Sequence, residues 1–444
     1  MLSVLKDRTY RHLFFAQVVA LGGTGLATVA LGLLAYDIAG ANAGAVLGTA
    51  LAIKMIAYIG IAPLAGAYAD RLPRKGLLVA TDLVRAAVAL LLPFVDAVWQ
   101  IYLLIFILQS SSAVFTPTFQ ATIPDILADE EDYTKALSLS RLAYDLESLL
   151  SPMLAAALLT VITFNWLFAG TSLGFIASAL LVLTTVLPHR KSAARLVEGV
   201  WQKTTRGMRV YLKTPRLVGL LAVTLAAAAG SAMVIVNTVV IVKEMGRSEG
   251  DVALALAAYG GGSMLSALAL PRLLKRINDR NVMIFGAAML AAMLAAIGLI
   301  LPGLTHGAIW PVLLAGWLGM GIAYSLCVTP SGRLLKRSSG ENDRPALFAA
   351  QFALSHVSWL IAYPVAGQVG AGAGMVPAFL FLAGLAAIGL MLALLLWPRR
   401  DPDILLHEHP DLPADHPHLM GHRAGRHEHA FVIDDLHTSW PGKV

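Results

Sequence analysis

The decapeptide Gly66-Ala67-Tyr68-Ala69-Asp70-Arg71-Leu72-Pro73-Arg74-Lys75 is a short charged segment between two long apolar runs. The runs, 45–65 and 76–95, are each about 20 residues long, which is enough for a helix to span a bilayer core. The decapeptide therefore predicts a tight loop between two membrane-spanning helices. Its three cations indicate a cytoplasmic loop, because short cytoplasmic loops are enriched in Lys and Arg. The carboxylate of Asp70 adds nothing to that rule, so we expect neighbouring cations or a helix N-terminus to hold it.

This loop resembles the signature loop between helices 2 and 3 of major facilitator superfamily transporters. Gly66, Asp70, Arg71, Arg74 and Lys75 match that pattern, and a proline stands where a second glycine is usual. The resemblance implies a gating loop, in which these residues latch the two halves of the carrier together in one of its states. The alternative is a basic loop that does no more than fix the topology.

Composition indicates a polytopic membrane protein. The chain has 444 residues, of which 57% are hydrophobic and 14% are charged, whereas soluble domains carry about 25% charged residues. We attribute the formal net charge of +6 to cytoplasmic loops rather than to nucleic-acid binding. The single cysteine, Cys327, excludes a disulfide framework within the chain. We expect no cleavable signal peptide, because 1–12 is short and basic and the next apolar stretch is long enough to span.

The apolar pattern predicts an all-α membrane protein with twelve transmembrane helices in two six-helix pseudo-repeats. In lipid such runs must be helical, because backbone groups have to pair internally. Lys and Arg gather in the loops assigned to one side, and the outer loops hold only Lys243 and Arg247, so both termini are expected to be cytoplasmic. The expected spans are 13–36, 45–67, 77–95, 100–123, 136–161, 165–187, 217–242, 252–274, 282–301, 309–331, 346–369 and 376–397.

Two pairs of prolines indicate that the halves are repeats. Pro117 and Pro330, and likewise Pro152 and Pro364, recur at nearly the same offset. Parallel six-helix repeats with a substrate path between them are what the facilitator fold has. The predicted organisation is an N-terminal bundle over 1–188, a cytoplasmic linker over 189–216, a C-terminal bundle over 217–398 and a cytoplasmic His-rich tail over 399–444. Within the linker, 197–212 has the pattern of a surface helix.

Ionisable residues inside spans are costly in lipid and are therefore functional candidates. Lys54 lies near the middle of the second span. Asp82 and Arg85 are three apart, and we expect a structural ion pair. In the fifth span Arg141 can pair with Asp145, four residues away, which leaves the carboxylate of Glu147 for cation binding or proton carrying.

His356, in the eleventh span, lies near Asp145 by the repeat offset. An imidazole and carboxylates at similar depth predict a divalent-cation site; the alternative is a packing histidine. Four polar residues in spans 1, 4, 7 and 10 are weaker candidates for the transport path, because those helices line the cavity in the superfamily: Gln17, Gln109, Asn237 and Tyr324.

The tail from residue 399 is rich in histidine. Imidazoles interleaved with carboxylates suit borderline divalent metals such as nickel, cobalt, zinc or copper. The alternative is a solvated tail that binds metal only opportunistically. We also expect 431–437, which is apolar, to dock on the inner face of the carrier. The eight candidate metal ligands are His407, His409, His416, His418, His422, His427, His429 and His437.

Two resemblances point to the solute. The fourth span has no charge where drug:proton antiporters of the superfamily carry an arginine, and its Phe115-Thr116-Pro117 segment is similar to the branch that holds macrolide-type effluxers and nickel-resistance permeases. A His-rich cytoplasmic tail on that branch resembles nickel/cobalt-resistance permeases.

The combined hypothesis is a secondary efflux transporter of the bacterial inner membrane. It would export nickel or cobalt, in exchange for protons, by alternating access; the alternative solute is an amphiphilic, macrolide-type drug. We expect a monomer that uses no cofactor and binds no nucleic acid, with the divalent metal acting as substrate. An enzyme is disfavoured, because the sequence has no P-loop motif, no H-E-x-x-H and no nucleophile elbow.

Overall fold

The structure is a computed structural model that describes residues 2–68, 73–127, 129–187, 200–339, 344–402, 404–408, 426–434, 436–437 and 440. In these residues the chain is almost entirely helical. The α-helices are α1 (Arg8–Ala39), α2 (Ala43–Tyr68), α3 (Arg74–Leu91), α4 (Val98–Ile126), α5 (Glu130–Leu158), α6 (Phe164–Leu183), α7 (Val200–Lys213), α8 (Pro215–Glu244), α9 (Glu249–Leu273), α10 (Asp279–Ile300), α11 (His306–Val328), α12 (Ser331–Arg337), α13 (Arg344–Ala373) and α14 (Met375–Leu396). Short 3-10 turns and one strand pair complete the described elements: η1 (Leu2–Lys6), η2 (Gly40–Asn42), η3 (Leu92–Phe94), η4 (Leu301–Gly303), β1 (Ile404–Glu408) and β2 (Arg426–Ala430).

Twelve of the described α-helices are long, and two, α7 and α12, are short. Ten described segments have the length and hydropathy to cross a membrane, and the first of them, Arg8–Ile61, contains α1 and most of α2. The helix α5 has 29 residues and is long enough to cross, but it is more polar than the others and is not among those segments. The described helices are therefore consistent with the expected count of twelve.

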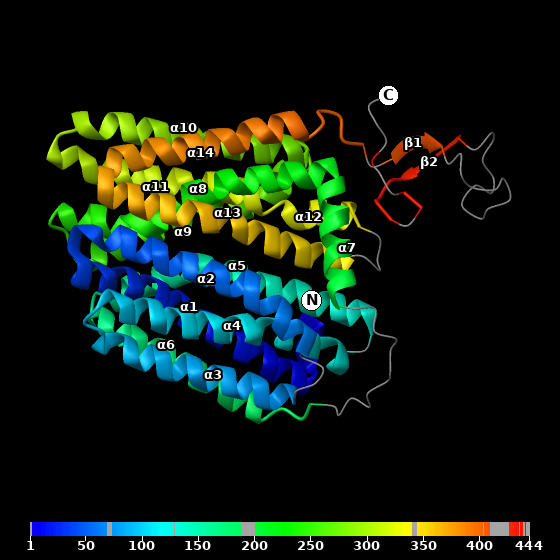
Figure 1. Ribbon diagram of the computed structural model, residues 1–444, viewed down its shortest axis with the longest axis horizontal. Coiled ribbons are helices and arrows are strands. Elements are labelled where there is room, and N and C mark those ends of the chain that lie inside the picture. The colour runs from blue at the N-terminus through cyan, green and yellow to red at the C-terminus, as the bar shows by residue number, and fades with distance from the viewer. Residues whose placement is uncertain are drawn as a thin grey trace.

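The long helices pack in two groups, which we call the N-half (α1–α6) and the C-half (α8–α14). Within the N-half, α1 packs on α6, α2 on α4 and α3 on α6; within the C-half, α8 packs on α14, α9 on α11 and α10 on α14. The halves meet chiefly where α2 packs on α13 and where α5 packs on α9. Figure 1 shows the blue and cyan helices on one side of this contact and the green to orange helices on the other.

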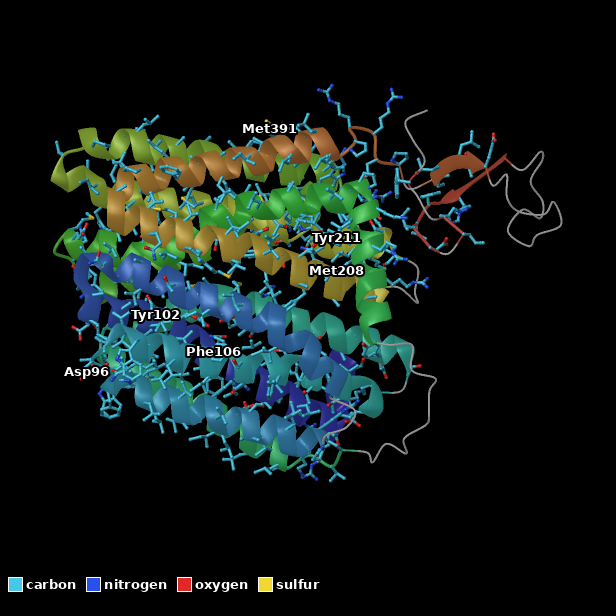
Figure 2. The ribbon with its side chains drawn as sticks, viewed as in Figure 1. Asp96, Tyr102, Phe106, Met208, Tyr211 and Met391 are labelled. Carbon is cyan, nitrogen blue, oxygen red and sulfur yellow. The ribbon has the colours of Figure 1, made fainter. Side chains whose placement is uncertain are left out.

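The two ends of the bundle differ. The chain's N-terminus, α7 and the strand pair lie at one end (Figure 1), which we call the basic end because its loops carry most of the Lys and Arg. Figure 2 shows Met208 and Tyr211 of α7 at this end and Asp96 towards the opposite end. The surface helix expected over 197–212 is thus found as α7, which packs on α13.

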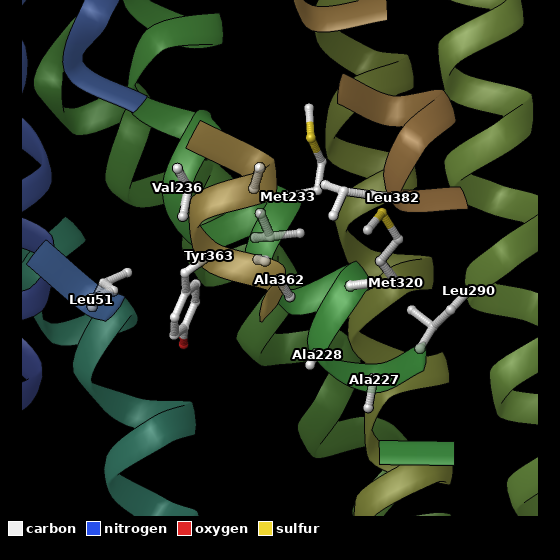
Figure 3. Packing of buried hydrophobic residues seen from close by; sticks show 14 of the residues in the cluster. Leu51, Ala227, Ala228, Met233, Val236, Leu290, Met320, Ala362, Tyr363 and Leu382 are labelled. Atoms are coloured by element: carbon white, nitrogen blue, oxygen red, sulfur yellow. The ribbon is translucent and has the colours of Figure 1, made fainter. Parts of the chain in front are cut away.

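The hydrophobic core continues from one half into the other. Its C-half part is built on α8, whose small and apolar residues are buried on nearly every side, as Ala227, Ala228 and Met233 illustrate. Figure 3 shows these residues packed against Leu290 and Met320, with Tyr363 of α13 reaching towards Leu51 of α2. A helix that is apolar all round suits the centre of a membrane bundle.

The described part of the tail folds back onto the C-half. Strands β1 and β2 pair antiparallel, with His407 opposite His427 in the register. After β2, Phe431 and Ile433 are buried in the main core cluster, and the ring of Trp440 lies 5.1 Å from the guanidinium of Arg216. The expected docking of 431–437 is therefore confirmed for its described residues.

Candidate functional site

Three of the ionisable residues predicted from the sequence interact where the halves meet. The charge of Glu147, on α5, acts on Lys54, on α2. The charge of Lys54 also acts on His356, on α13. All three side chains are half-buried. Lys54 therefore links a carboxylate of the N-half to an imidazole of the C-half.

The position of His356 is fixed by its surroundings. Its Nδ1 lies 2.5 Å from the carbonyl oxygen of Phe352, and because a carbonyl can only accept, Nδ1 carries the proton and donates. The ring stacks on Tyr58 of α2 at 5.4 Å between centroids, with an interplanar angle of 13°, and contacts the Phe352 ring at 4.1 Å. The remaining nitrogen, Nε2, is thus the one left to bind a proton or solute.

Glu147 lies where α1 and α5 pack closely; we refer to Lys54, Glu147 and His356 as the cluster. A Cβ on Gly25 of α1 would lie 1.9 Å from Oγ of Ser151 and 2.9 Å from Oε1 of Glu147. Real Cβ atoms do not come so near, so this face of α1 requires glycine. Since the side chains of Arg141 and Asp145 lie outside the described residues, their predicted pairing is not placed.

Lys54 also lines a small cavity inside the N-half. The cavity has a volume of about 20 Å³, which suits one water molecule. Its polar lining comes from Lys54, Gln109 and two threonines of α1, and its other walls are apolar. The full lining is Thr24, Ala27, Thr28, Leu31, Leu51, Lys54, Leu92, Ile105, Leu108, Gln109 and Phe175. The predicted candidate Gln109 therefore faces the same space as Lys54.

At the opposite end of the bundle the halves touch through glycines of α2 and α13. A Cβ on Gly48 would lie 2.5 Å from the carbonyl oxygen of Tyr363, and one on Gly367 would lie 2.2 Å from that of Gly44. Buried Asn237 of α8 joins this contact, because its Nδ2 donates to the carbonyl of Ala366 at 3.0 Å. Asn237, which we predicted in the transport path, therefore connects α8 to α13 beside the contact of Gly44, Gly48 and Gly367, which we call the glycine seam.

Two weaker candidates lie away from the cluster. Gln17 is buried, and its side-chain amide has no hydrogen-bond partner among the described residues. Tyr324, on α11, pairs with Tyr259 of α9 at 5.7 Å between ring centroids. Neither residue contacts Lys54, Glu147 or His356 in any interaction that the structure records.

The expected ion pair on α3 is present and buried. A guanidinium nitrogen of Arg85 contacts the carboxylate of Asp82, and Ser178 of α6 donates to the other carboxylate oxygen at 2.7 Å. The Arg85 guanidinium lies 4.2 Å from the ring centroid of Phe115 and 4.4 Å from that of Phe175. Every contact is within the N-half, which is the pattern of a structural pair.

The predicted gating loop is described in part. Gly66 lies near the end of α2 and Arg74 begins α3, whereas Asp70 and Arg71 lie outside the described residues. The Nζ atom of Lys75 donates to the carbonyl oxygen of Thr185 at 2.8 Å, just beyond the end of α6. This bond joins α3 to the end of α6 within one half. The predicted latch between halves therefore remains a prediction.

Half of the eight predicted metal ligands in the tail lie within the described residues. Among the described side chains, no group of three or more His, Cys, Asp or Glu is arranged to hold a metal ion. In the tail, the His429 ring lies 5.0 Å from the His437 ring, and Nδ1 of buried His437 lies 2.8 Å from Oδ1 of Asp434. His407 and His427 are placed by their strand register alone. The remaining tail candidates are outside the described residues: His409, His416, His418 and His422.

Sequence reasoning missed the aromatic and threonine residues of the site. Tyr58 is four residues after Lys54, and Phe352 is four before His356, so each shares a helix face with a residue that we singled out. Thr24 and Thr28 are spaced in the same way on α1. Spacing of four residues from Lys54 and His356 was the signal that could have identified Tyr58 and Phe352, whereas the sequence offered no such signal for the two threonines.

Comparisons with known proteins give the family and the fold. The model of the Major Facilitator Superfamily matches residues 13–240 and 220–417. Among solved structures, a D-xylose-proton symporter aligns with a TM-score of 0.64 and 15% identity, covering 89% of this chain and 97% of that one. A bacterial homologue of the lysosomal transporter Spinster, in an inward-facing and unoccupied conformation, has a TM-score of 0.66 and 12% identity, with coverage of 88% and 98%. At these identities the likeness concerns the fold.

The curated relatives are more similar in sequence than these solved structures, but the macrolide efflux proteins match over a shorter stretch. Macrolide efflux protein A of Enterococcus faecalis is 29% identical over 152 residues, which is 32% of this chain and 47% of that protein. The same-named protein of Streptococcus pyogenes matches over 37% of its length, so the chain spans less than half of these relatives. An uncharacterized MFS-type transporter of Bacillus subtilis, YvqJ, is 23% identical over 79% of this chain and 83% of its own length.

Proposed function

Because this chain belongs to the Major Facilitator Superfamily, we propose that it is an efflux carrier that exports an amphiphilic organic solute in exchange for protons. The observation that carries the proposal is the stacking of His356 of α13 on Tyr58 of α2, where the two halves meet and one helical turn from Lys54. A few polar groups next to aromatic surface are typical of sites for drug-sized organic molecules. The match to macrolide efflux proteins supports the same class of solute.

The proposed coupling step is protonation of Glu147. The carboxylate and Lys54 attract each other while both are charged, and a proton on Glu147 removes that attraction. Lys54 is then free to interact with His356 or with a polar group of the solute. Protonation of Glu147 thereby weakens the attraction between Glu147 and Lys54, both in the N-half, and favours an interaction of Lys54 with His356 of the C-half. A ligand or proton shifts a conformational equilibrium only if it interacts differently with the two conformations, and this step provides such a difference.

We also propose that the basic end faces the cytoplasm. The loops at this end hold most of the Lys and Arg residues, and positive loops are retained on the cytoplasmic side. The membrane in question would then be a bacterial inner membrane, with both termini inside. Solute would enter from the basic end and leave at the glycine seam.

A divalent metal fits the site between the halves poorly. Lys54 acts on both Glu147 and His356, and a dication about 5 Å from an ammonium is repelled by roughly 7 kcal/mol at an effective dielectric of about 20. Export of nickel or cobalt is nevertheless a second candidate, because the strand register sets His407 opposite His427 in the tail.

The test is export by a bacterial host with low background efflux. Cells expressing the full chain would be compared in their accumulation of a labelled macrolide and of labelled nickel, with and without a protonophore. We expect lower macrolide accumulation, reversed by the protonophore, and at least a tenfold loss of export for Glu147→Gln. The control is Glu249→Gln, which removes a carboxylate at the start of α9 whose partner, Lys243 at the end of α8, is 3.9 Å away.

A deletion distinguishes the two candidates. Removal of 404–444 keeps the contacts of Asp401 and Pro402 but eliminates the tail histidines. Macrolide export that survives the deletion supports the first candidate. Nickel export that the full chain performs and the shortened chain loses would overturn it in favour of the second.

A further inference from the structure

A second polar cavity lies at the basic end of the C-half, away from the site between the halves. Its volume is about 60 Å³, and its lining is Asn278, Asp279, Arg280, Arg337, Arg399 and Asp401. By this measure one water needs roughly 10–15 Å³, so the cavity has room for a small polyatomic group. Three of its six lining residues are arginines.

Both carboxylates of the cavity are already engaged. Asp279 is 3.0 Å from a guanidinium nitrogen of Arg337 and 3.4 Å from Nε of Arg333. Asp401 is 3.1 Å from Nε of Arg216, and it also accepts a hydrogen bond from Nε1 of Trp397 at 3.2 Å. The short contacts recorded for each carboxylate are therefore with residues other than Arg280 and Arg399.

Positive charge is left in excess beside the cavity. Arg280 is 8% exposed, and the one hydrogen bond recorded for it among the described residues is from Nε to the carbonyl of Trp397, at 3.1 Å. Its charge is repelled by Arg399 and attracted by Asp401, but Asp401 is shared with Arg216. Two guanidinium groups that line the same cavity repel each other, and an anion bound between them would offset this repulsion.

We propose that this cavity binds a phosphate group, with Arg280 and Arg399 as its principal ligands. A phosphate oxygen accepts two guanidinium N–H groups well, since Arg offers a planar fork of donors. The 22-residue helix α10 begins at this cavity, and the positive end of its dipole favours an anion there. No role in moving solute is needed for this site, so it stands apart from the proposed function.

The position suggests where the phosphate comes from. The cavity lies between the start of α10, at Asp279, and the end of α14, at Leu396, which are the ends of two spans and hence the depth of lipid headgroups. Basic pockets between transmembrane helices at this depth bind anionic headgroups. A free phosphate from solution has the same chemistry, and the experiment separates the two sources.

Thermal unfolding of the purified full chain in a neutral detergent tests the site. Inorganic phosphate would be titrated at constant ionic strength, and phosphatidylglycerol would be titrated in parallel with phosphatidylcholine. We expect a saturable rise of the unfolding temperature with at least one phosphate probe. A rise with inorganic phosphate identifies free phosphate as sufficient, whereas a rise with phosphatidylglycerol alone identifies the headgroup.

Two substitutions decide whether the cavity is responsible. Arg399→Gln, at an exposed position, should leave the fold intact and raise the half-saturating concentration about tenfold, and Arg280→Gln should do the same. The matched control is Arg400→Gln, the exposed neighbour that does not line the cavity. The proposal is overturned if neither probe gives a saturable shift, or if the control loses as much affinity as Arg399→Gln.

Discussion

At the scale of single residues, the two charge systems inside the N-half are built differently: Asp82 and Arg85 are buried, whereas Lys54 and Glu147 are half-buried. Asp82 and Arg85 are held by a direct contact, a serine hydroxyl and two aromatic rings. Lys54 and Glu147 interact through their charges, without a hydrogen bond to each other among the described residues. A pair whose hydrogen bonds are satisfied resists change, whereas a pair held by charge alone can exchange a proton or a partner. We therefore propose a structural role for Asp82 and Arg85 and a transport role for Lys54 and Glu147.

If Asp82 and Arg85 form a structural pair, breaking the pair should lower the free energy of unfolding of the protein. Asp82→Asn leaves the Arg85 guanidinium buried without its counter-charge, and breaking such a pair costs about 3–5 kcal/mol. The double variant Asp82→Leu/Arg85→Met removes both charges and should recover most of that loss. Thermal unfolding of the purified variants measures both effects. A single substitution that costs less than about 1 kcal/mol would show that the pair is not structural.

The contacts of Asp434 predict that the stability of the docked tail depends on pH. Burial opposes ionisation of this carboxyl, but hydrogen bonds from the backbone and ring of His437 and from the backbone of Leu436 outweigh it, so its pKa lies below the usual value of 3.8. Because the pKa of Asp434 is lower in the folded tail than in the unfolded chain, the ionised carboxylate stabilises the folded tail at pH values above the unfolded-state pKa. This stabilisation is lost as the pH falls through the folded-state pKa. Because Asp434 is about one-third exposed, we expect an effect of about 1 kcal/mol.

The measurement for Asp434 is hydrogen exchange of 426–437, corrected for the intrinsic rate. We expect protection to be constant from pH 7 to about 5 and to fall at lower pH. Asp434→Asn should show reduced protection already at pH 7, while Glu428→Gln, which alters an exposed carboxylate of β2, should behave as the unmodified chain. Equal protection in Asp434→Asn and the unmodified chain would contradict the assignment.

At the scale of elements, the contact between α2 and α13 depends on glycine. A Cβ on Gly48 or on Gly367 could not be added without moving a backbone carbonyl of the facing helix, and a Cβ on Gly44 would lie 2.6 Å from Oδ1 of Asn237. Close packing of helices in lipid relies on such small residues. The seam therefore favours the conformation described here, in which the opposite end is closed.

Gly48→Ala should shift the carrier away from that conformation. The added Cβ would lie 2.5 Å from the carbonyl oxygen of Tyr363, and overpacking of this kind costs about 1–3 kcal/mol. Spin labels at the exposed positions Asn42 and Gly372 should then report a longer distance by double electron–electron resonance. Gly60→Ala is the control on the same helix, because nothing lies within 4 Å of its Cβ position. The same distance distribution in both variants would refute the role of the seam.

The elements were largely predictable from sequence, and their contacts were not. Lipid leaves a long apolar run no alternative to a helix, so the run lengths alone predicted the long helices. The cluster of Lys54, Glu147 and His356 needed contacts between α2, α5 and α13, which periodicity in a single helix does not determine. Asn237 shows the same limit: its polarity was visible in the sequence, but the carbonyl of Ala366 to which it donates was not.

At the scale of the whole molecule, export by alternating access requires that the N-half and the C-half separate at the opposite end. Thr49 of α2 and Gln368 of α13 span this contact, with Nε2 of Gln368 3.3 Å from Oγ1 of Thr49. Two discrete arrangements of packed halves are the usual basis of such transitions. A covalent bridge at this point should hold the carrier in the closed arrangement.

The prediction is that Thr49→Cys/Gln368→Cys loses export when a short bis-methanethiosulfonate reagent bridges the two thiols, and regains it when dithiothreitol removes the bridge. The native Cys327 is 1% exposed, so it should not react and can be left in place. The measurement is export of the labelled solute, macrolide or nickel, that the untreated variant still transports. Each single-cysteine variant, treated in the same way, controls for simple modification of one side chain. Undiminished export by the bridged carrier would mean that the halves need not part at this seam, and the exit route would have to lie elsewhere.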